Sequence, residues 1–154
     1  MSLPEKLIWN TSYSIGNTTI DNEHMQMLQV YNELIDLIKN NEKDRRTFAS
    51  ILSKLTDFSL YHFKNEEKYM LNMKYPDIEE HKELHKEYIY QVALFNTELL
   101  GPNPPKPTEI INFVKNWLDN HIFKEDIKYV NFNKENNLNA KYSGQTSYFN
   151  PKNS

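Results

Sequence analysis

The sequence predicts an all-α fold, an up-down-up-down antiparallel four-helix bundle with an N-terminal arm and a polar C-terminal tail. Apolar residues recur at intervals of three and four along four long stretches, which is the periodicity of an amphipathic helix. The connections between these stretches are mostly short, so consecutive helices are expected to pack antiparallel. Only three glycines occur in 154 residues, which is few for a sheet-rich chain with tight hairpins.

Residues 1–20 precede the first helix and are interpreted as an arm that packs across a larger body. Their apolar residues do not follow helical spacing, and Trp9 is most simply a core anchor of this arm. The first helix is expected over residues 19–40 because its apolar residues keep helical spacing throughout. Thr18 or Thr19 is the expected N-cap.

The other three helices are expected over residues 44–73, 76–100 and 108–132. Asp44 is the expected N-cap of the second helix. Tyr75-Pro76 separates the second helix from the third, because proline disfavours a helical residue before it and opens a new helix well. Gly101 closes the third helix, and the proline-rich loop after it cannot be helical.

Composition limits the function classes. Residues 1–132 are assigned to one bundle domain with its arm, and residues 133–154 to a polar tail. The net charge of -3 indicates no nucleic-acid partner. The absence of cysteine excludes disulfides, thiolate metal sites and thiol catalysis. No run is apolar enough to span a membrane and no secretory signal is apparent, so a cytoplasmic protein without a membrane partner is expected.

Two pairs of potential metal ligands flank the break between the second and third helices. His62 and Glu66 are four residues apart, and so are His81 and His85, which places each pair one turn apart on one helix face. Either pair alone would more often be incidental. Together they put three imidazoles and a carboxylate on the inner faces of a helical hairpin, which is a set that suits a transition metal.

The chain has five histidines, and at least one falls on the apolar stripe of each expected helix. His24 lies on the first helix and His121 on the fourth, where Asp126 follows five residues later. A lone histidine on such a stripe is more often a hydrogen-bonded core residue. Five histidines at one level of an antiparallel bundle indicate a shared site instead. A buried carboxylate is costly unless it is paired or bound to metal, so a metal site explains both residue types.

The ordered motifs resemble those of the hemerythrins, most closely the single-domain bacterial ones. The resemblance covers roughly residues 7–132, and the matching segments are Ile20-Asp21-x-x-His24, His62-Phe63-x-x-Glu66-Glu67, Tyr75-Pro76 before His81-x3-His85, His121-x4-Asp126, and Trp9 with Tyr13-Ser14-Ile15-Gly16. The resemblance implies a four-helix bundle with a non-haem di-iron centre that binds dioxygen.

The resemblance also implies a role for each residue of the site. The implied iron ligands fall into three groups: His81, His85 and His121 on one iron; His24 and His62 on the other; and Glu66 and Asp126 bridging both. A solvent-derived oxo or hydroxo group would complete the bridge. One position would then stay open for dioxygen, on the iron with two histidines. The side chains expected to shape the dioxygen pocket, each also a core residue of any such bundle, are Phe63, Trp117, Ile122 and Met27.

The predicted function is reversible dioxygen binding for storage, delivery or sensing, and not enzymatic turnover. Di-iron oxygenases use about four carboxylates and two histidines, whereas this set offers two carboxylates and five neutral imidazoles. Fewer anionic ligands disfavour cleavage of the O–O bond. The alternative is a di-iron peroxidase or a scavenger of nitric oxide or peroxide. A module that signals to a protein partner is a third reading, and the sequence identifies no such partner.

The spacing of His121 and Asp126 predicts an irregular helix. Five residues on a regular helix separate two side chains by about 140°, yet both must face the same metals. A π-bulge or another distortion between Leu118 and Asp126 would align them, and such turns gather at functional sites. The alternative is that the two side chains reach inward from opposite flanks of a regular helix.

Overall fold

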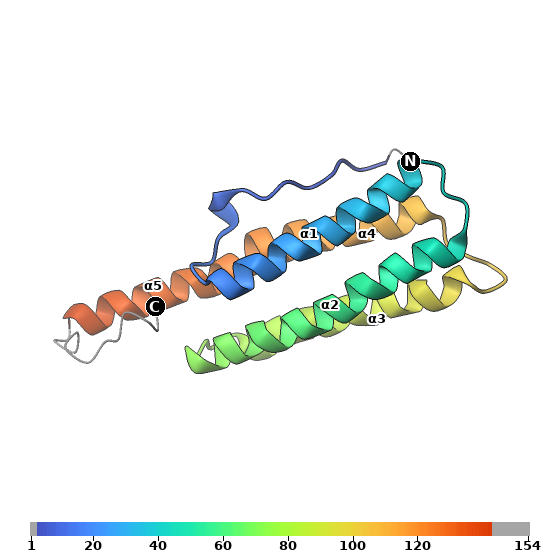
Figure 1. Ribbon diagram of the computed structural model, residues 1–154. Coiled ribbons are helices and arrows are strands. Elements are labelled where there is room, and N and C mark those ends of the chain that lie inside the picture. The colour runs from blue at the N-terminus through green and yellow to red at the C-terminus, as the bar shows by residue number, and fades with distance from the viewer. Residues whose placement is uncertain (1–2, 143–154) are drawn as a thin grey trace.

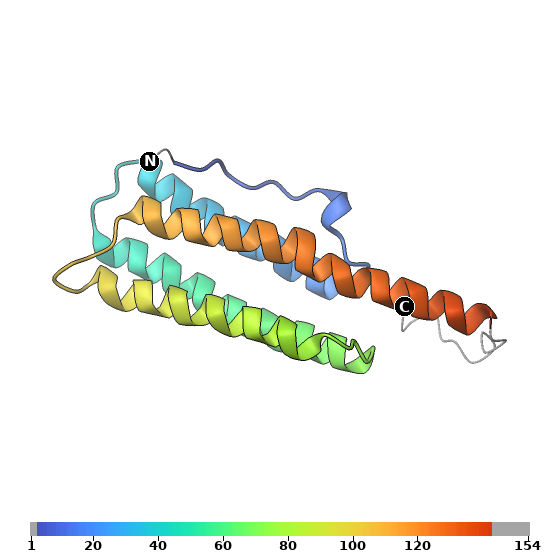
Figure 2. The same cartoon turned by 180° about the vertical axis from the view of Figure 1, so that it is seen from behind.

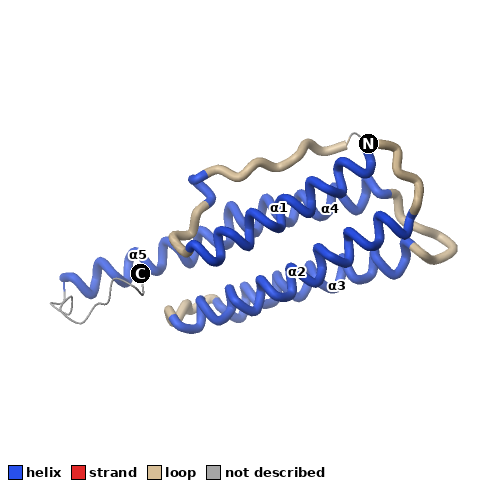
Figure 3. The backbone as a smooth tube through the Cα atoms, viewed as in Figure 1, coloured by secondary structure: helices blue, strands red, loops and turns tan. Residues whose placement is uncertain are grey.

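The structure is a computed structural model that describes residues 3–142 of the chain. Helices joined by loops make up this part of the chain, and no strand occurs in it (Figure 3). The α-helices are α1 (Thr18–Lys39), α2 (Arg45–Asn72), α3 (Ile78–Leu99), α4 (Pro107–Asn120) and α5 (Asp126–Tyr142). A 3-10 turn, η1 (Thr11–Tyr13), lies in the arm, and a π-helical segment, η2 (His121–Glu125), joins α4 to α5.

The helices form an antiparallel four-helix bundle, as the sequence predicts (Figure 1). Helices α1, α2 and α3 supply three of its members, and α4, η2 and the first part of α5 together supply the fourth. The arm runs alongside α1 before the chain turns into it. From both sides of the molecule, α5 is seen to project past the end of the bundle at which α2 meets α3 (Figure 2).

Local chemistry explains where the helices begin and end. The expected cap of α2 is confirmed, because the Asp44 side chain accepts the backbone N–H of Arg46. The expected cap of α1 is wrong: Thr18 is already helical, and the extended Asn17 caps the helix by accepting the N–H of Ile20. Between α2 and α3 the chain reverses at Lys74, which takes a left-handed φ of 58°.

The fourth member of the bundle extends further along the chain than the sequence predicts. Its apolar periodicity fades at Phe132, yet the helix continues to Tyr142. Residues 133–142, which the sequence assigns to the tail, therefore prolong α5. Val130 and Phe132 still pack against a small apolar cluster that includes Tyr75 and Tyr129. Beyond them the polar composition has no apolar stripe from which a helix could be predicted.

The main core fills the bundle on the side of the α1–α2 and α3–α4 connections. Its fully buried side chains include Tyr31, Leu52, Tyr88 and Ile111, each with 0% exposure. Together with the small cluster around Tyr129, this core leaves a polar layer between two apolar regions. Within residues 3–142, no helix combines the length and the apolar composition that crossing a membrane requires.

Candidate metal centre

All seven residues predicted to bind metal lie in this polar layer, and each is at most 2% exposed. Every member of the bundle contributes to the set: His24 from α1, His62 and Glu66 from α2, His81 and His85 from α3, His121 from η2, and Asp126 from α5. The structure thus brings together residues that are spread over more than a hundred positions of the sequence. Regular helical spacing brings His62 with Glu66 and His81 with His85 to one helix face each.

Three histidines meet on one side of the cluster. The Nε2 atom of His121 lies 3.1 Å from that of His81 and 2.9 Å from that of His85. Oε1 of Glu66 is 3.0 Å from Nε2 of His81 and 2.9 Å from Nε2 of His85. We call His81, His85 and His121 the three-histidine group.

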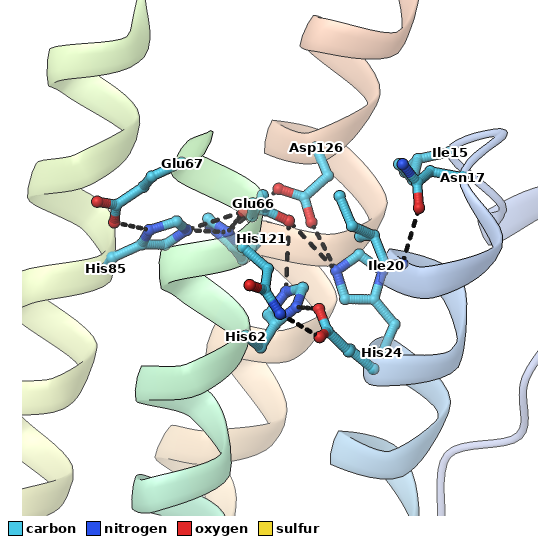
Figure 4. Close-up of polar contacts among 12 residues, drawn as sticks. Ile15, Asn17, Ile20, His24, His62, Glu66, Glu67, His85, His121 and Asp126 are labelled. Atoms are coloured by element: carbon cyan, nitrogen blue, oxygen red, sulfur yellow. Dashed lines mark hydrogen bonds and ion pairs between the residues drawn. The ribbon is translucent and has the colours of Figure 1, made fainter. Parts of the chain in front are cut away.

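The other two histidines lie on the opposite side of Glu66 (Figure 4). Nε2 of His24 is 3.4 Å from Oε2 of Glu66, and Nε2 of His62 is 3.3 Å from the same oxygen. The two imidazole rings meet edge to face with 4.6 Å between their centroids. We call His24 and His62 the two-histidine group.

Both buried carboxylates span the two groups. Glu66 turns Oε1 to the three-histidine group and Oε2 to the two-histidine group. Asp126 does the same, with Oδ1 3.0 Å from Nε2 of His81 and Oδ2 3.1 Å from Nε2 of His24. Each of these carboxylates therefore turns one oxygen to each histidine group.

Unpaired polar atoms test whether the cluster fits metal ions. Nε2 of His24, Nε2 of His62 and both oxygens of Asp126 are buried without a properly aligned hydrogen bond, although each lies near other polar atoms. Such atoms cost free energy unless something else satisfies them. The ligand atoms of Glu66, His81, His85 and His121 lie within 4.8 Å of one another, as do those of His24, His62 and Glu66, which is close enough for each set to share a cation.

The π-helical segment places His121 and Asp126 on the same side. The backbone N–H of Asp126 bonds to the carbonyl oxygen of His121, five residues back, and η2 covers His121–Glu125. This confirms the predicted distortion between Leu118 and Asp126. On a regular helix the two side chains would diverge by about 140°, so the extra residue in the turn allows both to enter the cluster.

Two carboxylates behind the histidines were not identified from the sequence. Glu23, only 5% exposed, accepts the Nδ1–H of His62 at 2.9 Å and an N–H of Asn65 at 2.6 Å. Glu67 accepts the Nδ1–H of His85 at 2.8 Å. Because a carboxylate accepts, the proton resides on Nδ1 in each ring and Nε2 is free to face the cluster.

A buried tyrosine completes the polar contacts and was also missed. The Tyr129 hydroxyl donates to Oε2 of Glu66 at 3.2 Å, and its ring lies 5.8 Å from that of His81. Tyr129 is fully buried, and burial followed by the nearby Glu66 and Asp126 carboxylates raises the pKa of its hydroxyl well above the usual value. The hydroxyl therefore stays a donor to Glu66 at neutral pH.

Aromatic rings hold the imidazoles from outside the cluster. Phe63 stacks on His85 with 3.8 Å between centroids and 4° between planes, and Trp117 stacks on His121 at 4.2 Å and 14°. Both rings thus pack against the three-histidine group. The other two residues predicted to shape a pocket, Met27 and Ile122, are fully buried in the main core.

Charge compensation in the metal-free protein depends on protons. Burial lowers the pKa of His24, but the adjacent Asp126 and Glu66 carboxylates outweigh it and raise that pKa to about 10. The same balance raises the pKa of His81 to about 10. Burial instead lowers the pKa of His121. Burial raises the pKa of Glu66, but the nearby imidazoles of His121, His24 and His62 outweigh it and hold that pKa well below its usual value.

An antiparallel bundle with a buried cation-binding cluster of histidines and carboxylates defines a class of histidine-rich metal-binding helical proteins. Comparison with known proteins identifies the family within this class. Residues 16–132 match the model of the hemerythrin HHE cation-binding domain. The chain belongs to the hemerythrin family.

Named relatives agree with this assignment. A bacteriohemerythrin from Clostridium acetobutylicum is 28% identical over 128 residues, covering 80% of this chain and 98% of that protein. Myohemerythrin-1 from Phascolopsis gouldii is 30% identical over 128 residues, covering 82% and 94%. A crystal structure of wild-type hemerythrin superposes with a TM-score of 0.72 at 26% identity, covering 80% of this chain and 94% of that one.

Proposed function

We propose that the chain binds dioxygen reversibly at a centre of two iron ions, for oxygen storage, delivery or sensing. In this proposal the three-histidine group holds one iron, the two-histidine group holds the other, and Glu66 and Asp126 bridge the two. Membership of the hemerythrin family supports the proposal. So does the division of the described ligand atoms into two sets around Glu66.

The spacing of the imidazole nitrogens is the observation that carries the proposal. Nε2 atoms of the three-histidine group approach to 2.9 and 3.1 Å. Two nitrogens bound at right angles to one ion, each by a bond of about 2.1 Å, would lie about 3.0 Å apart. At this distance in a dry site, two facing nitrogens need a proton or a cation between them, and a single cation would satisfy all three nitrogens at once.

The donor set is compatible with iron, which the family assignment favours among the metals that such ligands bind. It offers imidazole nitrogen and carboxylate oxygen without sulfur, which suits iron and disfavours soft ions that require thiolate. Two iron(II) ions held there would supply the electrons with which dioxygen is bound and later released. With five neutral imidazoles and two carboxylates, the ligand set does not favour O–O cleavage.

The surrounding side chains keep the site dry and rigid. Met27 and Ile122 are 0% exposed, so they exclude water from the region near the cluster. Phe63 and Trp117 fix the ring planes of His85 and His121 by stacking. Glu23 and Glu67 fix which nitrogen of their histidine partners carries the proton.

The test begins with elemental analysis, which should find two irons per chain after expression with iron. The reduced protein is then followed by absorption spectroscopy under nitrogen, during oxygen addition and during oxygen removal. A spectrum that cycles between a pale reduced form and a coloured form supports a carrier. Continuous oxygen consumption in the presence of a reductant would instead support the peroxidase or scavenger alternative.

A further inference from the structure

We propose that the N-terminal arm, residues 3–16, is the gate through which small ligands reach the two-histidine side of the centre. Trp9 and Tyr13 are the side chains that close it. This inference rests on the proposed function, because it specifies how a ligand of dioxygen size enters that site and what determines the rate of entry.

The arm places an aromatic ring beside His24 of the two-histidine group. The Trp9 ring lies 6.4 Å from the imidazole of His24, and Tyr13 meets Trp9 edge to face at 5.8 Å. Tyr13 in turn packs on Phe123 of η2, with 3.8 Å between ring centroids. The two arm rings therefore bridge α1, which carries His24, and η2, which carries His121.

A few hydrogen bonds hold the arm in place, together with an exposed ion pair between Lys6 and Asp36 and the packing of Leu3 and Leu7 against the main core. The Asn32 side chain accepts the N–H of Leu7 at 2.9 Å and donates to the carbonyl oxygen of Leu7 at 2.8 Å. The Tyr31 hydroxyl donates to the carbonyl oxygen of Glu5 at 3.1 Å. All of these bonds join a side chain of α1 to arm backbone, so they can break without disturbing the hydrogen bonds of any helix.

The arm is anchored most firmly where it enters α1. Asp21 accepts the Ser14 hydroxyl at 2.5 Å and the N–H of Ile15 at 2.9 Å, and Ile15 is 4% exposed. Between this anchor and α1 lies Gly16, whose φ of 78° favours glycine. Residues 3–13 can therefore swing away from α1 while residues 14–16 stay bound to it.

Opening the arm is the least costly way to uncover His24. Trp9 and Tyr13 are only half-buried, whereas Met27 and Ile122 are fully buried in the main core. Separating the helices would break that core and approach the free energy of global unfolding. Local openings of weakly packed segments cost far less, and ligand-binding elements are drawn from such segments.

On the other side of the centre, rings that stack directly on the imidazoles cover the three-histidine group, although Trp117 is itself only half-buried. Trp117 stacks on His121 and packs 4.2 Å from the ring of Tyr88, which is 0% exposed. Phe63 is 3% exposed and stacks on His85. A ligand entering from this side would have to displace rings that stack on the imidazoles, so the arm is the favoured route.

The test uses the iron-loaded, oxidised full chain and azide, a small anion whose complex with ferric iron is coloured. Stopped-flow absorption gives the rate of azide binding, and displacement gives the rate of release. Asn32→Ala removes both hydrogen bonds to Leu7. It should raise both rates about tenfold, the factor that corresponds to the net free energy of one to two hydrogen bonds. Their ratio, the dissociation constant of azide, should stay unchanged.

Two further variants complete the design. Trp9→Ala removes a closing ring and should also raise both rates together. Asn96→Ala is the matched control, because Asn96 bonds to Ser53 between α2 and α3, away from the arm. It should leave both azide rates at wild-type values. Hydrogen exchange should show faster exchange at the Leu7 amide in Asn32→Ala, with unchanged exchange in the helices.

The possible results separate the gate from the function on which it rests. Unchanged azide rates in both Asn32→Ala and Trp9→Ala would refute the gate. A changed dissociation constant with an unchanged binding rate would also refute it, because the arm would then hold the ligand and not control entry. A wild-type protein that forms no azide complex would refute the proposed di-iron function, and the gate would fall with it.

Discussion

Glu23→Gln is expected to weaken metal binding at the two-histidine group while the fold is retained. Glu23 has two polar partners: one oxygen accepts from Nδ1 of His62 and the other accepts from Asn65. Glutamine keeps the shape but has a single acceptor oxygen, so its NH2 group must face either the Nδ1–H of His62 or the NH2 group of Asn65. Either arrangement leaves one donor without an acceptor and removes a negative charge from behind His62.

The size of the effect follows from this loss. Partners that orient a metal-bound histidine typically contribute a factor of about 10–100 in metal affinity, which is about 1.4–2.7 kcal/mol. The upper part of this range is expected because Glu23 is only 5% exposed, so water cannot replace the missing acceptor. His81, His85 and His121 have no contact with Glu23 and should hold their iron as before.

The assay is competition with an iron chelator, followed by the iron remaining per chain. Glu23→Gln should lose one iron at a lower chelator concentration than the wild type and the second at the same concentration. Glu33→Gln is the matched control, because Glu33 lies on the same helix in an exposed pair with Lys54. If Glu23→Gln and Glu33→Gln both keep wild-type affinity, Glu23 has no positioning role.

Three further predictions concern the cluster. Asp126→Ala should abolish binding of the iron pair by elemental analysis, whereas Lys64→Ala, on the exposed face of α2, should keep it; two irons in Asp126→Ala would contradict the proposed bridge. Tyr129→Phe removes the donor to Glu66 and should lower the free energy of unfolding in urea by about 1 kcal/mol; an unchanged value would show that this bond contributes nothing. The metal-free protein should lose thermal stability as pH rises from about 6.5 to about 10. The folded-state pKa values of His24 and His81 are raised to about 10, so the stabilising protonated forms are lost in that window. A melting temperature that rises with pH in this window would contradict the prediction.

Periodicity was sufficient to predict the fold and the members of the cluster. The spacing of His62 with Glu66 and of His81 with His85 already determines that each pair shares a helix face. The same reasoning detected the irregular turn, because the spacing of His121 and Asp126 does not fit a regular helix. These features depend on residues near each other in the chain, which is where a single sequence is informative.

Contacts between distant parts of the chain were not predictable in this way. Glu23 and His62 are 39 residues apart, and Tyr129 and Glu66 are 63 apart. Glu67 belongs to a matching motif segment, but its partner His85 is 18 residues away, so their contact was not predicted. The length of α5 was missed for a different reason, since residues 133–142 have no apolar stripe and their helix continues one that the bundle has already formed.

The carboxylates behind the histidines also change the charge balance inferred from the sequence. Five imidazoles and two carboxylates are the candidate metal ligands. Glu23 and Glu67 add two negative charges that reach these ligands through hydrogen bonds to His62 and His85. Each glutamate accepts the Nδ1–H of its histidine partner. This hydrogen bond makes Nε2 of the same imidazole a stronger donor to a metal. Glu67 is 28% exposed at its side chain and Glu23 only 6%, so water screens the charge behind His85 more than the charge behind His62. The stronger electrostatic support therefore belongs to the two-histidine group, the side of the centre that the arm covers and at which we propose that ligands enter.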